Sequence, residues 1–102
     1  MTKYVLTYHD GGPMPETEEG MAQLMEAWGA WFGSLGDSVT DGGNPFGQGK
    51  IIVADGTVSE GMRASGYSVI AADDIDDAVA KSKGCPVLAG GGTVAVHEAI
   101  DM

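Results

Sequence analysis

The sequence is poor in cations, in cysteine and in long apolar runs, and each shortage excludes a class of protein. Only 5 Lys and Arg oppose 15 Asp and Glu, which gives a formal charge of -10 at pH 7. A protein that binds nucleic acid or an anionic membrane surface needs cations to neutralise phosphates, so neither is an expected partner. The single cysteine, Cys85, excludes an internal disulfide, and no Cys and His residues have the spacing of a zinc site.

No apolar run approaches the roughly 18 residues of a membrane-spanning helix. The first residues, MTKYVLTYHD, lack the apolar region of a signal peptide. We therefore expect a cytoplasmic protein, and we expect neither a cofactor nor a metal. With 102 residues, of which 43% are apolar, the chain has the size and composition of one domain that covers residues 1–102.

The first two elements are the clearest. Residues 3–9, KYVLTYH, predict a strand that ends at the turn residues 10–13. A helix is expected between an N-cap at Thr17 and a terminating Gly36, because apolar residues recur there at spacings of three and four. Trp31 lies at the edge of this apolar stripe. The stripe consists of Met21, Leu24, Met25, Trp28, Phe32 and Leu35.

The rest of the chain predicts further strands, a turn and a second helix. The strands are expected at residues 38–40, 50–54, 57–59, 67–72 and 93–100. The turn DGGNPFG (41–47) predicts a bulge or a wide loop, and Asp55-Gly56 predicts a hairpin. The second helix should begin after Asp73 or Asp74 and stop at Gly84.

This order of elements, β-α-β-(hairpin)-β-α-β, predicts an α+β fold. Its expected form is a ferredoxin-like β-α-β-β-α-β sandwich with an extra hairpin. In such a fold one layer of helices covers only one face of the sheet. The strands carry little charge on either face, so a second copy of the sheet is the expected cover, and we predict a homodimer.

Several segments of the sequence resemble the YCII-related domain family, over nearly the whole chain. They are KYVLTYH, the helix exit WGAWFGSLG, the turn VTDGGNPFG, the segment GYSVIAADDIDDAVAKSKGCP and the final GGTVAVHEA. The resemblance implies a dimeric α+β barrel with a cleft between the two sheets. It also implies acid-base chemistry by a His-Asp pair, whose aspartate corresponds to Asp41. The family's histidine belongs to the first helix region, and residues 16–36 contain none.

Only two histidines are present, His9 and His97, and they fall in the first and last predicted strands. These strands are neighbours in a ferredoxin-like sheet, and by alternation both side chains should face the cleft, with Asp41 near its mouth. We take His9 and Asp41 as candidate catalytic groups and His97 as a candidate ligand-binding residue. Each has a structural alternative: the histidines bonded at a sheet end or a dimer interface, and the aspartate in an Asx turn.

Trp31 and Phe46 are the remaining candidates for ligand binding, because small-molecule clefts are commonly lined by aromatic side chains with a few polar groups. Trp28 belongs to the apolar stripe, and Cys85 is expected to be buried. Two functions stay open. The first is an uncharacterised YCII-like acid-base enzyme, of lyase or isomerase type, that acts on a small organic molecule in the inter-sheet cleft. The second is a noncatalytic dimeric domain that binds a small ligand or has an accessory role.

Overall fold

The computed structural model describes residues 1–10, 15–61 and 64–101 of the chain, and these form an α+β fold. Residues 11–13 of the predicted first turn lie outside this part. The elements are β1 (Thr2–His9), α1 (Glu18–Leu35), the 3-10 helix η1 (Gly36–Ser38), β2 (Val39–Asp41), β3 (Lys50–Ile52), β4 (Val58–Glu60), β5 (Gly66–Ala72), α2 (Ile75–Ser82), α3 (Pro86–Ala89) and β6 (Thr93–Glu98).

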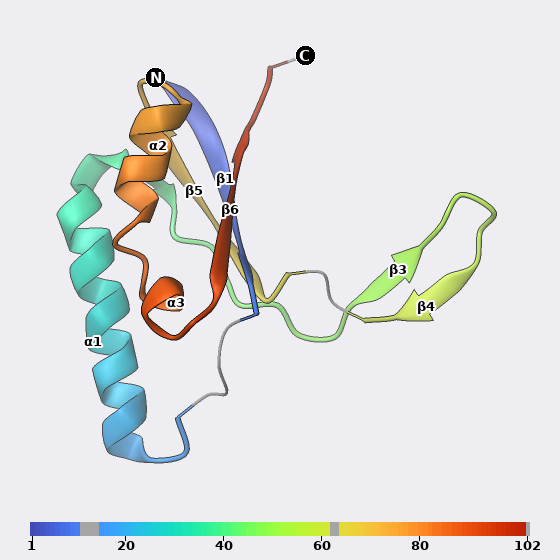
Figure 1. The fold of residues 1–102 in the computed structure, drawn as a ribbon, viewed down its shortest axis with the longest axis horizontal. Helices are drawn as coiled ribbons and strands as arrows, with labels where there is room; N and C mark the ends of the chain where they lie inside the picture. Colours follow the sequence, from blue (N-terminus) through green and yellow to red (C-terminus); the bar gives the residue numbers. More distant parts are fainter. Residues whose placement is uncertain (11–14, 62–63, 102) are drawn as a thin grey trace.

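Four strands form an antiparallel sheet in the order β2-β5-β1-β6, while β3 and β4 pair with each other in a separate hairpin. The first and last strands are neighbours, as predicted, with Thr7 opposite Ala95. The α-helices lie on one side of the sheet, and the β3–β4 hairpin extends away on the other side (Figure 1).

The core lies between the sheet and the helices. Along β5 every second residue is buried and the residues between are half-exposed, as expected for a sheet with a single helical layer. The buried core consists of Tyr4, Leu6, Tyr8, Trp31, Ile70, Ala72, Ala78 and Cys85. We call the opposite side the open face. It carries Lys3, Val5, Thr7, His9, Asp41, Tyr67, Val69, Ala71, Thr93, Ala95 and His97.

Helix α1 begins and ends as predicted, and its apolar stripe faces the core: Trp28, Phe32 and Leu35 pack against the buried cluster. Thr17 caps it by accepting the Gly20 N–H at 3.0 Å. Met25, predicted to be in the stripe, is 67% exposed, whereas Trp31 is only 5% exposed. The predicted position of Trp31 at the edge of the stripe is therefore wrong. Its indole N–H donates to the carbonyl of Lys81 at 3.0 Å, which ties α1 to α2 and explains why this side of the helix faces inward.

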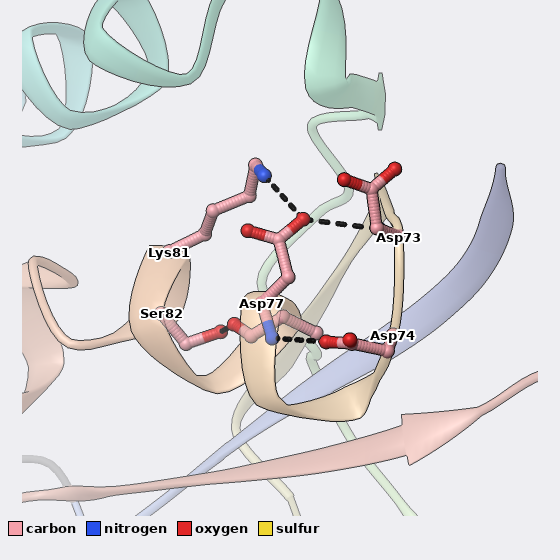
Figure 2. A network of polar contacts seen from close by, with 6 residues as sticks. Asp73, Asp74, Asp77, Lys81 and Ser82 are labelled. Carbon is pink, nitrogen blue, oxygen red and sulfur yellow. Dashed lines mark hydrogen bonds and ion pairs between the residues drawn. The ribbon is translucent and has the colours of Figure 1, made fainter.

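Helix α2 is held at its start by carboxylates (Figure 2). Asp74, one of the two predicted caps, accepts the Asp77 N–H at 2.7 Å. Asp77 in turn accepts from Lys81 Nζ at 2.7 Å and from the Asp73 N–H at 3.0 Å. The bond from Lys81, aided by the one from Asp73, lowers the pKa of the Asp77 carboxyl.

The turn after β2 is irregular, as DGGNPFG predicts. The register of β2 against β5 shifts between Val39 and Asp41, and an isolated bridge joins Pro45 to Gly66. Between these points Gly43 adopts a φ of 77°. A Cβ atom on Gly43 would lie 1.7 Å from the carbonyl oxygen of Tyr67, so only glycine fits there. The glycine thus lets the turn pass close against β5.

Candidate functional site

Two histidines from different strands meet at one threonine on the open face. Thr7 Oγ1 lies 2.8 Å from His9 Nε2 and 3.3 Å from His97 Nε2. His9 follows Thr7 by two residues on β1, so both side chains point to the same face. His97 comes from β6, where it is paired with Val5 of β1. The first and last strands therefore bring the only two histidines of the sequence to a single hydroxyl.

The hydroxyl makes the two imidazole rings unequal when both are neutral. Thr7 has one hydroxyl proton and two lone pairs, so it can donate to only one of the two Nε2 atoms. The other Nε2 must then carry the proton and donate to Thr7. One ring is thus a proton acceptor at Nε2 while the other is a proton donor. A site with one base and one acid in fixed positions suits proton transfer.

A second group of polar and aromatic side chains lies on the β2–β5 side of the open face. The Tyr67 hydroxyl donates to Asp41 Oδ2 at 3.4 Å, a weak bond. The ring of Phe46 stacks on that of Tyr67, with centroids 5.7 Å apart and an interplanar angle of 22°. Phe46 is held by its backbone N–H, which donates to the Ser65 carbonyl at 2.8 Å. The turn thus places the stacked rings of Phe46 and Tyr67 beside the Asp41 carboxylate.

Asp41 also has a structural role of the kind expected for Asp-Gly-Gly. Its Oδ1 accepts the Gly43 N–H at 2.9 Å, which closes an Asx turn. Below this turn, Ser68 Oγ donates to the Gly42 carbonyl at 2.7 Å and accepts from the Tyr8 hydroxyl at 2.6 Å. Burial raises the pKa of Tyr8 to about 12, so the tyrosine remains a donor at neutral pH. These buried bonds fix the backbone that carries Asp41.

The histidines at Thr7 and the group around Asp41 share the open face, but Asp41 does not contact His9. Strand β5 lies between β2 and β1, so Asp41 and His9 are two strand spacings apart. At about 4.8 Å for each spacing, the sheet separates them laterally by about 10 Å. A catalytic hydrogen bond needs about 3 Å, so His9 and Asp41 form no direct dyad here. Tyr67 bridges the gap, since it is paired with Thr7 across β5 and β1 and also reaches Asp41.

Phe46 also borders a shallow depression between the sheet and the hairpin. The described residues that line it are Phe46, Gly47, Gln48, Gly49, Lys50, Ile51, Gly61 and Ala64. Phe46 itself is 43% exposed. The depression opens beside the stacked rings of Phe46 and Tyr67, and among the described residues that line it Lys50 is the one with a cationic side chain. Its shape is that of an open half-site rather than of an enclosed cavity.

Trp31 lies on the opposite side of the sheet from the histidines. It packs in the core against Trp28, with ring centroids 5.7 Å apart, and contributes to a shallow groove between α1 and α3. It therefore does not share a cleft with His9. Cys85 is buried beside it, as expected, and burial raises the pKa of its thiol. A buried thiol in its protonated form is a poor nucleophile.

Thr7 and Tyr67 are the site residues that sequence reasoning missed. Both have the parity of the open face, Thr7 with His9 and Tyr67 with Val69, so the alternation of each strand carried the signal. What the sequence could not supply was the register, which sets Tyr67 opposite Thr7 and brings His97 within reach. In the part of the chain that the structure describes, no group of three or more potential metal ligands gathers.

No model of a protein family matches the chain, and no curated protein or solved structure matches it significantly. Among residues 1–10, 15–61 and 64–101, no helix combines the length and the apolar character needed to cross a membrane.

Proposed function

We propose that this chain is a YCII-like, ferredoxin-like α+β protein that forms a homodimer through its open face and acts in the cytoplasm. The cleft between the two sheets takes a small organic molecule, on which His9 and His97 act as an acid-base pair of lyase or isomerase type. The strand order β2-β5-β1-β6 supports the ferredoxin-like topology. The observation that carries the function is the position of Thr7 Oγ1 between the two Nε2 atoms.

The proposed chemistry follows from the unequal rings. The reactive state has one neutral ring, which accepts from the Thr7 hydroxyl at Nε2, and one imidazolium ring, which donates to Thr7 from Nε2. The neutral ring removes a proton from a carbon or a hydroxyl of the substrate and becomes an imidazolium. The original imidazolium gives its proton to a second position, or to a leaving group, and becomes neutral, so the number of protons is conserved. After one turnover each ring has exchanged its role. The Thr7 hydroxyl, bonded to both, then returns the proton and restores the starting state.

The dimer supplies what the single chain lacks. His97 is exposed and His9 is half-exposed in the described chain, so water would compete for both rings. A second sheet over the open face would exclude that water and strengthen the hydrogen bonds at Thr7. Asp41 and Tyr67 would hold the far side of the ligand, and Phe46 would stack on its apolar part.

A test of catalysis uses exchange of substrate protons with solvent. The protein is incubated in D₂O with a panel of enolisable ketones and phenols, and deuterium incorporation is followed by proton NMR. We expect incorporation into at least one compound, and a loss of about 100-fold or more in His9→Gln and in His97→Gln, since general acid-base groups contribute at least that much. In Thr7→Val, which keeps both rings but removes the relay, turnover should fall while binding is kept.

The noncatalytic alternative is favoured by one observation, the use of Asp41 Oδ1 to close its own turn. In that case the open face binds a ligand without transforming it. The same panel then gives no deuterium incorporation above the buffer. Backbone amide shifts that change on addition of a phenol, and that cluster at Thr7, Tyr67 and His97, would establish the binding domain instead.

A further inference from the structure

The β3–β4 hairpin, residues 50–60, is an arm that stands apart from the sheet (Figure 1). Its base is narrow, because the Gly61 N–H donates to the Gly49 carbonyl at 3.2 Å. Its tip is closed by Asp55, whose Oδ1 accepts the Thr57 N–H at 2.8 Å. The arm is therefore a defined hairpin on a pinched base, and it projects on the same side as the open face.

The arm exposes an apolar pair that has no cover from the described chain. Ile52 is paired with Val58 across the hairpin, and they are 72% and 54% exposed. The neighbouring Val53 is 48% exposed. A hairpin of two short strands is marginally stable by itself in water. Exposed apolar side chains on such a hairpin indicate a surface that packs against another protein. Such an arm needs a surface to rest on.

The whole chain exposes more surface than a compact monomer of its mass. Its accessible area is 6902 Å². Folded monomers of 10.4 kDa expose about 5,400 Å², so the excess is about 1,500 Å². The radius of gyration, 15.0 Å, likewise exceeds the value of about 13 Å for a compact domain of this length. A stable interface buries about 800 Å² of each partner, so the excess is large enough to form one.

The open face is the surface that suits the arm. Among its described side chains only Lys3 and Asp41 carry a formal charge, and Val5, Val69 and Ala95 lie along its middle. Most of the acidic residues lie elsewhere, in α1, α2 and the loops. The arm carries a net charge of -1 from Lys50, Asp55 and Glu60, so it is repelled less by such a face than by the helical side of a chain with a charge of -10.

The base of the arm also lies at the histidine end of the sheet. Ser65, four residues after Gly61, donates its N–H to the carbonyl of Tyr8, the residue before His9. The arm thus leaves the sheet next to Thr7 and the two histidines, and beside the depression at Phe46. An arm from a second copy, related by a twofold axis, would arrive at the equivalent end of the partner's cleft or across its mouth.

We propose that the arm packs on a second copy of this chain, with Ile52 and Val58 in contact with the partner and the arm closing the partner's cleft. Each site would then be completed by residues of the other copy. The inference rests on the proposed homodimer, and it adds that the dimer is held by exchanged arms rather than by the open faces alone.

The experiment measures the dimer dissociation constant by sedimentation velocity over a concentration series. In the first variant residues 50–60 are replaced by two glycines, which the close approach of Gly49 and Gly61 permits. In the second, Ile52→Gln is combined with Val58→Gln. The matched control is Ser59→Gln, which changes an exposed polar residue of the same arm. We expect both test variants to weaken the dimer by about 100-fold or more, and the control to leave it unchanged.

The outcomes separate the arm from the dimer itself. If the intact chain dimerises and both test variants dimerise equally well, the exchanged arm is wrong and the open-face dimer stands. If the intact chain is a monomer, both proposals fail.

A photo-crosslinker, p-benzoylphenylalanine in place of Val58, identifies the contact: crosslinks between chains to peptides of the open face support the exchange. Crosslinks only within one chain would overturn it. The same crosslinker at the exposed Gln23 of α1 should give no dimer.

Discussion

The turn that carries Asp41 and Phe46 depends on a single glycine, and replacing it is the sharpest test of the described geometry. In Gly43→Ala, the new Cβ would lie 1.7 Å from the carbonyl oxygen of Tyr67 and 2.6 Å from its carbonyl carbon. Ordinary contacts begin at 3.4 Å, so the turn must move away from β5. That movement would stretch the bond from Ser68 Oγ to the Gly42 carbonyl, now 2.7 Å, and the bond from the Tyr67 N–H to the Asn44 carbonyl, now 3.3 Å.

The expected cost adds two effects. A left-handed backbone at a residue with a Cβ costs about 1 kcal/mol. The loss of hydrogen bonds around a buried serine costs about 1 to 3 kcal/mol. We therefore expect Gly43→Ala to lower the free energy of unfolding by about 3 kcal/mol. For a chain of this size the melting temperature should fall by about 12 °C or more.

Thermal and urea unfolding, followed by circular dichroism, measure this loss. Gly42→Ala is the matched control, because a Cβ on Gly42 meets no atom within 4 Å and its backbone is not left-handed. It should change the melting temperature by no more than about 3 °C, as surface substitutions usually do. If both variants melt alike, or if Gly43→Ala retains the stability of the parent, the turn does not pass against Tyr67 as described.

Three further predictions concern the helices and the buried tyrosine. Gly29→Ala and Gly33→Ala should each raise the free energy of unfolding by about 1 kcal/mol in urea titrations, because both sites are exposed on α1 with no atom within 4 Å of a new Cβ; a loss of stability would mean that another surface packs there. Asp74→Ala should cost about 1 kcal/mol in the same titrations, since it removes the cap of α2, and an unchanged midpoint would contradict that role. The pKa of Tyr8 is about 12 in the folded chain and 10.0 when the side chain is exposed. As the pH rises from 10 to 12, the Tyr8 hydroxyl therefore loses its proton in the unfolded chain first. The free energy of unfolding falls by about 2 kcal/mol over that range. Tyr8→Phe should remove that part of the pH dependence, and an identical alkaline loss in Tyr8→Phe would show that another group causes it.

Much of the fold follows from local signals in the sequence. Thr17 and Gly36 mark the ends of α1, and Asp74 marks the start of α2, because caps and terminating glycines act within one turn of their own position. The two-residue alternation of β1 and β6 places His9 and His97 on the open face. These features depend on neighbours in the sequence, so they could be predicted without the structure.

The rest depends on contacts between distant residues. Trp31 and Met25 both fit a helical apolar stripe, and only the packing against α2 decides that Trp31 faces inward. Thr7 became a site residue through the register of β6, and Tyr67 through that of β5. The separation of Asp41 from His9 likewise follows from the position of β5 between β2 and β1. Strand order and register are set by the whole sheet, which no single segment encodes.

We propose that a second copy of the chain covers the open face, with Thr7 and the two histidines inside the resulting cleft. Sedimentation equilibrium of the intact chain at micromolar concentration and neutral pH tests it most directly. A homodimer has a mass twice that of the 10.4 kDa chain, and this is the mass we expect. A mass of 10.4 kDa that does not change throughout the micromolar range would contradict it.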